Sequence, residues 1–336
     1  MRDGRGAAAW LVDALRRRVK AAVGARVGLR LIAAGRNGRL FLTAGHLAYP
    51  HPVWVWRRVA RHLRPTDRLC WLTYWYSDAA YFCAAAQEYR RIGFPIDQVW
   101  VLGNTREEVA AATAAGFRAA WVHNNCWLDE ELFRPCSEPK RFAAVMVTQP
   151  AAYKRPWLAA QVPDLAIVAG RPVAARRADL PALPHSAFYK DLSPDQVCHV
   201  INQSRVGLIL SEEEGGCFAS SEYLMCGIPV VSTPSRGGRD VFYDAANSLI
   251  VEPVAEAVAR AVVGLANRRP DAEQISRSHL ERVREFRGTF VRDVLSPTLD
   301  EIGADDTPKR VLESTRRHKM IDWLYPGAAI RLLRKH

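Results

Sequence analysis

Between residues 39 and 123 the chain alternates between short apolar runs and amphipathic segments, and this rhythm limits the possible folds more than any other feature. The runs at 39–45, 67–75, 98–104 and 118–125 are rich in branched and aromatic side chains, which is typical of strands. Apolar residues recur at helical spacing in the segments between them, 51–63, 80–94 and 105–117. Thr105, followed by Glu107 and Glu108, is a candidate helix N-cap. The rhythm predicts a parallel sheet with helices on its faces.

A second alternating region starts at residue 142, after a polar segment that is interrupted by Pro135 and Pro139. Its expected strands are 142–148, 165–170, 206–211 and 229–234, and its expected helices are 154–162, 193–204 and 220–227. A length of 336 residues suits two such domains. We therefore predict two Rossmann-like α/β domains over residues 1–137 and 138–300. A basic helical tail over 301–336 could pack back on the first domain.

The net charge of +12 predicts an anionic partner: nucleic acid, a membrane surface or a phosphorylated substrate. The excess lies mainly at the ends, because the first forty residues carry ten Lys and Arg against two Asp. Residues 8–35 combine these cations with helical apolar spacing, which predicts an amphipathic basic helix. That helix could pack on the body or contact an anionic membrane. No nucleic-acid partner is expected, because basic and aromatic residues are not interleaved and no binding module is recognisable.

The seven cysteines are odd in number and form no C-x-x-C pair, which argues against disulfides and structural zinc. No run of the sequence has the length and apolarity of a secretory signal or a spanning helix. We expect a cytoplasmic protein, with peripheral contact to the inner face of the membrane as an option.

Residues 206–253 are the most informative stretch for function. A strand leads into Ser211, three glutamates and two glycines, and a helix is expected from about Ala219, so backbone N–H groups gather at a positive helix end that suits a phosphate. Glu214 and Glu222 can accept hydrogen bonds from the vicinal hydroxyls of a sugar. The alternative is that both are solvent-exposed acids, one on a charged turn and one on a helix surface.

Residues 142–253 resemble the donor-binding half of the family-four glycosyltransferases. The segment E-G-G-C-F-A-S-S-E is followed by C-G-I-P-V-V, by S-x-G-G-R-D and by N-S-L-I-V-E-P in the family's order, and N-N-C-W-L-D-E-E-L-F-R-P resembles its linker. The resemblance implies a GT-B fold with a donor cleft between two domains. It also implies a retaining hexosyltransferase that uses a nucleotide-diphosphate sugar and no cofactor. No metal ion is expected, since no D-x-D motif follows a strand.

The resemblance assigns roles to individual residues of this donor half. Glu222 would bind the ribose hydroxyls and Glu214 the transferred sugar, so Glu214 is a candidate catalytic residue. Lys154 matches the lysine that binds the donor diphosphate. The position of the accompanying arginine is occupied by Gln149, and Arg155 is an alternative source of that charge. The nucleotide base is expected near residues 185–192. The backbone expected to face the sugar and the diphosphate is that of Gly215, Gly216, Cys217 and Phe218.

The first domain matches the family only in its rhythm, and it is expected to hold the acceptor, a glycan or lipid-linked glycan of polysaccharide or glycolipid biosynthesis. Where family members often present a histidine to the sugar, this chain has Asp78. Two candidates for the catalytic role remain: Asp78 itself, or His46 from the first strand. The tryptophans of this domain are expected mostly in the core, with stacking on sugar rings as the alternative. They are Trp54, Trp56, Trp71, Trp75 and Trp100.

Gln149 and the short first domain also leave a rival function open. The chain could be a GT-B protein without transfer activity, either a sugar-nucleotide epimerase or the binding subunit of an active partner. No carboxylate is compellingly placed as a nucleophile, which favours a front-face reaction in which the leaving phosphate helps to deprotonate the acceptor.

Overall fold

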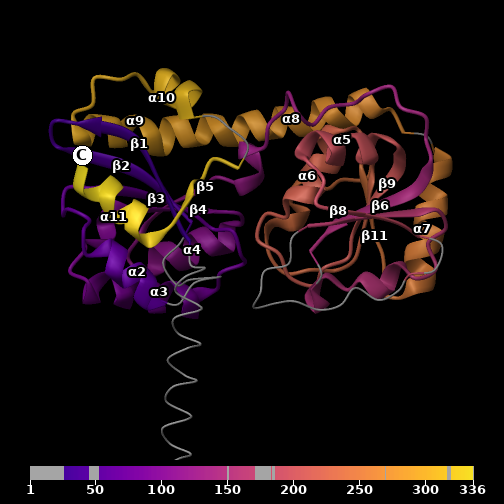
Figure 1. The fold of residues 1–336 in the computed structure, drawn as a ribbon, viewed down its shortest axis with the longest axis horizontal. Coiled ribbons are helices and arrows are strands. Elements are labelled where there is room, and N and C mark those ends of the chain that lie inside the picture. The colour runs from indigo at the N-terminus through magenta and orange to yellow at the C-terminus, as the bar shows by residue number, and fades with distance from the viewer. Residues whose placement is uncertain are drawn as a thin grey trace, which may run out of the picture.

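The computed structural model describes residues 26–44, 53–149, 151–170, 183, 186–268, 270–315 and 319–335. These residues form two α/β units that lie next to each other (Figure 1). Each unit is built on a six-stranded sheet, in the order β12-β1-β2-β3-β4-β5 for the first and β11-β10-β9-β6-β7-β8 for the second. The predicted architecture of two Rossmann-like units, with helices flanking mainly parallel sheets, is confirmed.

The first unit follows the predicted rhythm of strand and helix. Its parallel strands alternate with three helices, and Thr105 caps the third of them in a capping box, its Oγ1 accepting from the Glu108 N–H at 3.1 Å. The predicted N-cap is confirmed. The strands are β2 (Gly38–Thr43), β3 (Arg68–Leu72), β4 (Val99–Gly103) and β5 (Arg118–Trp121), and the helices are α2 (Val53–Ala60), α3 (Ala79–Arg91) and α4 (Arg106–Ala114).

The N-terminal part of this sheet corrects two predictions. Residues 27–35 form strand β1 (Val27–Gly35), so the helix predicted over 8–35 is wrong there; residues 8–25 lie outside the described residues. Strand β1 runs antiparallel to β2 across the tight Arg36–Asn37 turn, and antiparallel also to β12 (Trp323–Leu324), so the first sheet is mixed. The helical spacing of the apolar residues ends at position 23 of the sequence. From Val27 on, pairing with β2 buries Leu29, Ile32 and Ala33.

The second sheet is parallel throughout, and its strand order is that of the doubly wound nucleotide-binding fold. The order reverses between β6 and β9, and ligands of such sheets bind beyond the C-terminal ends of the strands at that point. The elements are β6 (Phe142–Thr148), β7 (Leu165–Ala169), β8 (Ser186–Lys190), α5 (Pro194–Asn202), β9 (Ser204–Ile209), α6 (Phe218–Met225), β10 (Val230–Ser232), β11 (Ser248–Ile250) and α7 (Ala255–Arg268).

The helix predicted over 154–162 is wrong. The chain forms two short 3₁₀ turns there, Ala152–Lys154 and Pro156–Ala159. Arg155 separates them with a left-handed φ of 47°, and Pro156 has no N–H to continue a helical ladder.

A long helical segment returns the chain to the first unit. Helix α8 (Ala272–Thr289) continues through a π turn at Phe290–Leu295 into α9 (Ser296–Ile302), where Pro297 lacks an N–H and the Ser296 hydroxyl donates to the Val291 carbonyl at 2.8 Å. Helix α9 contacts β1 and β2, α10 (Pro308–Thr315) follows, and α11 (Pro326–Lys335) packs against α2. Figure 1 shows α8 reaching across both units. The boundaries at residues 137 and 300 stay predictions.

Candidate active site

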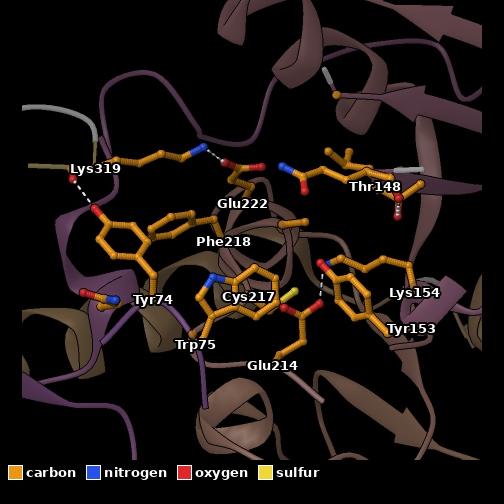
Figure 2. A pocket seen from close by; sticks show the side chains of 16 residues that line it. Tyr74, Trp75, Thr148, Tyr153, Lys154, Glu214, Cys217, Phe218, Glu222 and Lys319 are labelled. Atoms are coloured by element: carbon orange, nitrogen blue, oxygen red, sulfur yellow. Dashed lines mark hydrogen bonds and ion pairs between the residues drawn. The ribbon is translucent and has the colours of Figure 1, made fainter. Parts of the chain in front are cut away.

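A cavity of about 270 Å³ lies between the two units, at the point where the order of the second sheet reverses. Tyr74 and Trp75, which follow β3, border it together with Asn124 of the inter-unit segment and Lys319 of the C-terminal segment. Figure 2 shows Tyr74, Trp75 and Lys319 on the side of the cavity that faces Glu214, Phe218 and Glu222. The second unit supplies the rest of the lining: Val147, Thr148, Gln149, Tyr153, Lys154, Gly170, Glu214, Gly216, Cys217, Phe218, Ala219 and Glu222.

Glu214 lies on the loop after β9 and pairs with the Lys154 ammonium. Burial lowers the pKa of Lys154, but the charge and hydrogen bond of Glu214, together with Cys217 and Tyr153, outweigh this, so the pKa lies above its ordinary value and the ammonium stays charged at neutral pH. Residues 236 and 237 hold this loop in place. The Glu214 N–H donates to the Arg236 carbonyl at 3.0 Å. A side chain at Gly237, where φ is 102°, would overlap the Glu214 carbonyl. This places the carboxylate on the cavity wall.

Glu222 lies on α6, and Lys319 approaches it from the C-terminal segment, with Nζ 3.6 Å from Oε1. Burial raises the pKa of Glu222, and Lys319 opposes that effect only in part. Glu214 and Glu222 are each only 5% exposed. The alternative that they are solvent-exposed acids is therefore wrong.

The N-terminus of α6 borders the cavity, and the inter-unit segment holds it in place. The Asn125 amide donates to the carbonyls of Gly216 and Cys217, at 2.7 and 3.1 Å, and to the Ser221 hydroxyl at 2.8 Å. Because first-turn N–H groups of a helix lack intrahelical acceptors, this end attracts anions. Burial raises the pKa of the Cys217 thiol to about 12, so the thiol stays protonated at neutral pH.

The comparisons bear on this part of the chain. The family model described as glycosyl transferases group 1 matches residues 171–281, which include β9, α6 and both glutamates. The resemblance to these enzymes is confirmed over this segment. A search of the curated proteins found no significant match.

Solved structures also resemble the chain at low identity. HepE from Anabaena in complex with UDP-glucose is 14% identical, over 69% of this chain and 76% of that one, with a TM-score of 0.45. Sucrose-phosphate synthase from Thermosynechococcus elongatus is 15% identical, over 69% and 68%, with a TM-score of 0.49. The lipopolysaccharide outer core galactosyltransferase WaaB in its apo form is 14% identical, over 73% and 79%, with a TM-score of 0.48.

Gly215 of the glycosyltransferase motif does not line the cavity but lets the two units meet there. A Cβ atom at this position would lie 2.6 Å from the Tyr74 carbonyl oxygen. A Cβ at Gly216, which does line the cavity, would lie 2.6 Å from the Asn125 side-chain oxygen. Gly215 thus allows the close backbone approach that brings Tyr74 and Trp75 to the cavity, and Gly216 leaves room for Asn125.

Besides Gly215, two further predicted residues do not line the cavity. Asp78 is exposed and caps α3, its carboxylate accepting from the Tyr81 N–H at 2.8 Å. The Arg155 guanidinium donates to the Leu210 carbonyl at 2.6 Å and to the Thr233 hydroxyl at 2.8 Å, so it joins the ends of β9 and β10. Gln149 does line the cavity. His46, and His185 near the expected base site, lie outside the described residues.

Sequence reasoning missed several cavity residues, among them Tyr74, Asn124 and Lys319. Trp75, expected mostly in the core, also lines the cavity, whereas Trp56 and Trp71 are buried as expected. No sequence pattern around Lys319 indicated a site, because its approach to Glu222 depends on the return of the C-terminal segment to the first unit. Asn124 had a weak signal, since it begins the segment that resembles the family linker.

The described residues contain no group of three or more His, Cys, Asp or Glu side chains that could hold a metal ion. Within the same residues, no helix combines the length and apolar character needed to cross a bilayer.

Proposed function

We propose that this protein is a glycosyltransferase that moves a sugar from a nucleotide-diphosphate sugar to an acceptor hydroxyl, with retention of configuration. One observation carries the proposal: two buried carboxylates, each paired with a lysine, share a cavity with the N-terminus of α6. Carboxylates accept from sugar and ribose hydroxyls, whereas ammonium groups and helix N-termini bind phosphates. The match of residues 171–281 to the group 1 glycosyl transferases supports this interpretation.

In this proposal Glu222 accepts from the ribose hydroxyls, Glu214 contacts the transferred sugar, and Lys154 neutralises the diphosphate. Lys154 and Glu214 are in contact, so the ligand would exchange this ion pair for contacts of its own. The Asn124 side-chain oxygen is buried and has no hydrogen-bond partner among the described residues. It is therefore placed to accept from a sugar or acceptor hydroxyl, since a buried acceptor without a partner is costly.

The proposed reaction breaks the bond between the anomeric carbon and the diphosphate oxygen and forms a bond to the acceptor oxygen on the same face. The acceptor proton passes to the leaving phosphate. Lys154 and the α6 N-terminus stabilise the charge that develops there, so the proposal needs no metal ion. Among the described lining residues the only carboxylates are Glu214 and Glu222, both ion-paired, which favours this front-face route over a covalent intermediate.

Thermal unfolding with UDP, GDP and ADP tests the donor site, because a ligand that binds only the folded state raises the unfolding temperature. Each nucleotide is then tested as its sugar conjugate for hydrolysis and transfer, and NMR of the product gives its anomeric configuration. We expect one nucleotide to stabilise the parent and not the Glu222→Ala variant. No shift with any nucleotide would contradict the proposal. Conversion of the donor to its epimer, without transfer, would support the epimerase instead.

We further propose that the face formed by α2 and α11 contacts an anionic membrane that carries the acceptor. The two helices pack together, and Trp54, Trp323 and Tyr325 nearby are 39%, 44% and 54% exposed. Aromatic side chains at a basic surface suit the interface of an anionic bilayer. Flotation with phosphatidylglycerol and phosphatidylcholine vesicles tests this, and equal recovery with both lipids would contradict it. The exposed cations of this face are Arg58, Arg61, Arg64, Arg331, Arg334 and Lys335.

A further inference from the structure

The C-terminal segment holds Lys319 firmly at the cavity. The Lys319 N–H donates to the Trp127 carbonyl at 3.1 Å, and its carbonyl accepts from the Tyr74 hydroxyl at 3.0 Å. The next residue, Met320, is fully buried, and its carbonyl accepts from Arg30 at 3.0 Å. The backbone is therefore fixed to the first unit, while the side chain extends toward α6 of the second (Figure 2).

The backbone conformation of this segment is one that side chains disfavour. Lys319 and Met320 have left-handed φ angles of 63° and 54°, although neither is a glycine. Such conformations persist only where surrounding contacts enforce them, and they concentrate at functional sites. The segment thus holds a disfavoured backbone at the point where Lys319 enters the cavity.

The Lys319 ammonium lies close to two side chains of α6, Phe218 and Glu222. Its Nζ is 3.6 Å from the Glu222 carboxylate and 4.8 Å from the centre of the Phe218 ring, and the side chain is 40% exposed. A ligand can therefore reach it. Lys154 extends into the cavity from the opposite side (Figure 2).

The charges of the described lining residues are balanced when the cavity is empty of ligand. Lys154 and Lys319 are its two cations, and Glu214 and Glu222 its two anions. A nucleoside diphosphate sugar brings two negative charges, and its ribose hydroxyls can satisfy Glu222 in place of Lys319. Gln149 is neutral, and Arg155 is engaged with the strand ends. One lysine alone would leave the dianion half compensated.

We propose that Lys319 is a second cationic ligand of the donor diphosphate, delivered by the C-terminal segment. This inference rests on the proposed function. Without donor, Lys319 neutralises Glu222. When the ribose binds Glu222, the ammonium turns to the phosphates, so Lys154 and Lys319 hold the diphosphate from opposite sides. In this exchange Glu222 accepts from the ribose hydroxyls and Lys319 donates to a phosphate oxygen, so neither charged group is left without a partner.

Calorimetric titration of UDP and UMP, or of GDP and GMP if the guanine nucleotide binds the parent, tests this role. Lys319→Ala should weaken diphosphate binding about tenfold to hundredfold, the effect of removing one charged hydrogen bond. Monophosphate binding should change by less than about threefold, because a monophosphate lacks the β-phosphate that Lys319 would bind. Lys319→Arg should keep most of the affinity. The matched control is Lys309→Ala, an exposed lysine of α10 that should bind both ligands like the parent.

The outcomes separate the two proposals. If the parent binds the diphosphate and Lys319→Ala binds it equally well, or weakens binding of both ligands by the same factor, the proposed bond to the diphosphate is wrong while the donor site stands. Tighter diphosphate binding by Lys319→Ala would show that Lys319 blocks the ribose position, which also overturns the inference. If the parent binds no nucleoside diphosphate, the proposed function fails and this inference fails with it. Lys319→Gln removes the charge but keeps most of the side-chain length. Its thermal unfolding without ligand, compared with that of the parent, checks that the fold stays intact.

Discussion

The side of the cavity formed by the second unit comes largely from one stretch of chain, whereas the opposite side is assembled from distant segments. Glu214, the α6 N-terminus and Glu222 lie within nine consecutive residues of the sequence. Tyr74 and Lys319, which share a hydrogen bond on that opposite side, are 245 residues apart. A site built from one loop and one helix leaves a recognisable motif, but a site assembled by tertiary structure does not. The side formed by the second unit could therefore be predicted from the sequence, and the opposite side could not.

The largest effect is expected at the Lys154–Glu214 pair. It tests whether the reaction depends on the side of the cavity formed by the second unit. Lys154→Ala removes the charge proposed to stabilise the leaving diphosphate, so transfer should fall at least a hundredfold. It also leaves the Glu214 carboxylate buried without its partner, which should cost about 3 kcal/mol of unfolding free energy. Transfer assays and urea unfolding measure the two effects.

The double variant Lys154→Ala/Glu214→Gln separates stability from chemistry. Neutralising Glu214 removes the unpaired buried charge, so most of the stability should return while transfer stays low. Recovery of activity together with stability would mean that Lys154 is a structural residue. The proposed role of Lys154 in the reaction would then be wrong.

A smaller effect is expected at Glu222. The Glu222→Gln variant keeps the size of the side chain but weakens its acceptance from two ribose hydroxyls, so the KM for the donor should rise about tenfold. The kcat should change little, because the ribose lies away from the reacting bond. Steady-state kinetics with varied donor measures both. A fall in kcat at unchanged KM would move Glu222 from donor binding to the reaction itself.

Strands β2 to β7, β9 and β10 and helices α2 to α6 were predictable because burial and period agree in them. At β6 the predicted and observed ends coincide at 142 and 148. Prediction failed where a tertiary contact overrides local pattern. Residues 27–35 belong to the range predicted as a helix, but they pair with β2. Asp78 lies in a loop expected near the sugar, but its carboxylate caps α3. Lys319 lies on no motif, and only the return of the C-terminal segment brings it to Glu222.

The contact between the two units should depend on pH. His123 of the inter-unit segment and His279 of α8 both pack on Phe242, with ring centres 4.8 and 4.6 Å from it. Burial lowers the pKa of His123 to about 4 and that of His279 to about 3, against 6.5 for an ordinary histidine. Below pH 6.5 the unfolded chain therefore binds protons that the folded chain does not. As the pH is lowered below 6.5, the free energy of unfolding should decrease by up to about 1.4 kcal/mol per pH unit for each histidine.

His279→Phe tests this pH dependence without breaking a hydrogen bond. Neither ring nitrogen of His279 has a hydrogen-bond partner among the described residues, and its ring packs on that of Phe242. The variant should lose less stability than the parent between pH 7 and pH 5, as measured by urea midpoints. An equal loss of stability in the variant and the parent would show that water reaches His279, and that the two units pack less tightly there than the buried rings indicate.

The smallest effect is expected at Asp78, and it decides how far the acceptor side can be understood as structure alone. Asp78→Ala removes the N-cap of α3, so the unfolding free energy should fall by about 1 kcal/mol while transfer is unchanged. Asp78→Asn and Asp78→Ser keep a capping acceptor without a carboxylate and should restore the stability. Donor hydrolysis and transfer are measured for all three variants. A loss of transfer in all three, with donor hydrolysis intact, would mean that the carboxylate reaches the acceptor in the working enzyme. The first unit would then contribute a reacting side chain as well as part of the cavity lining, because capping a helix does not require a negative charge.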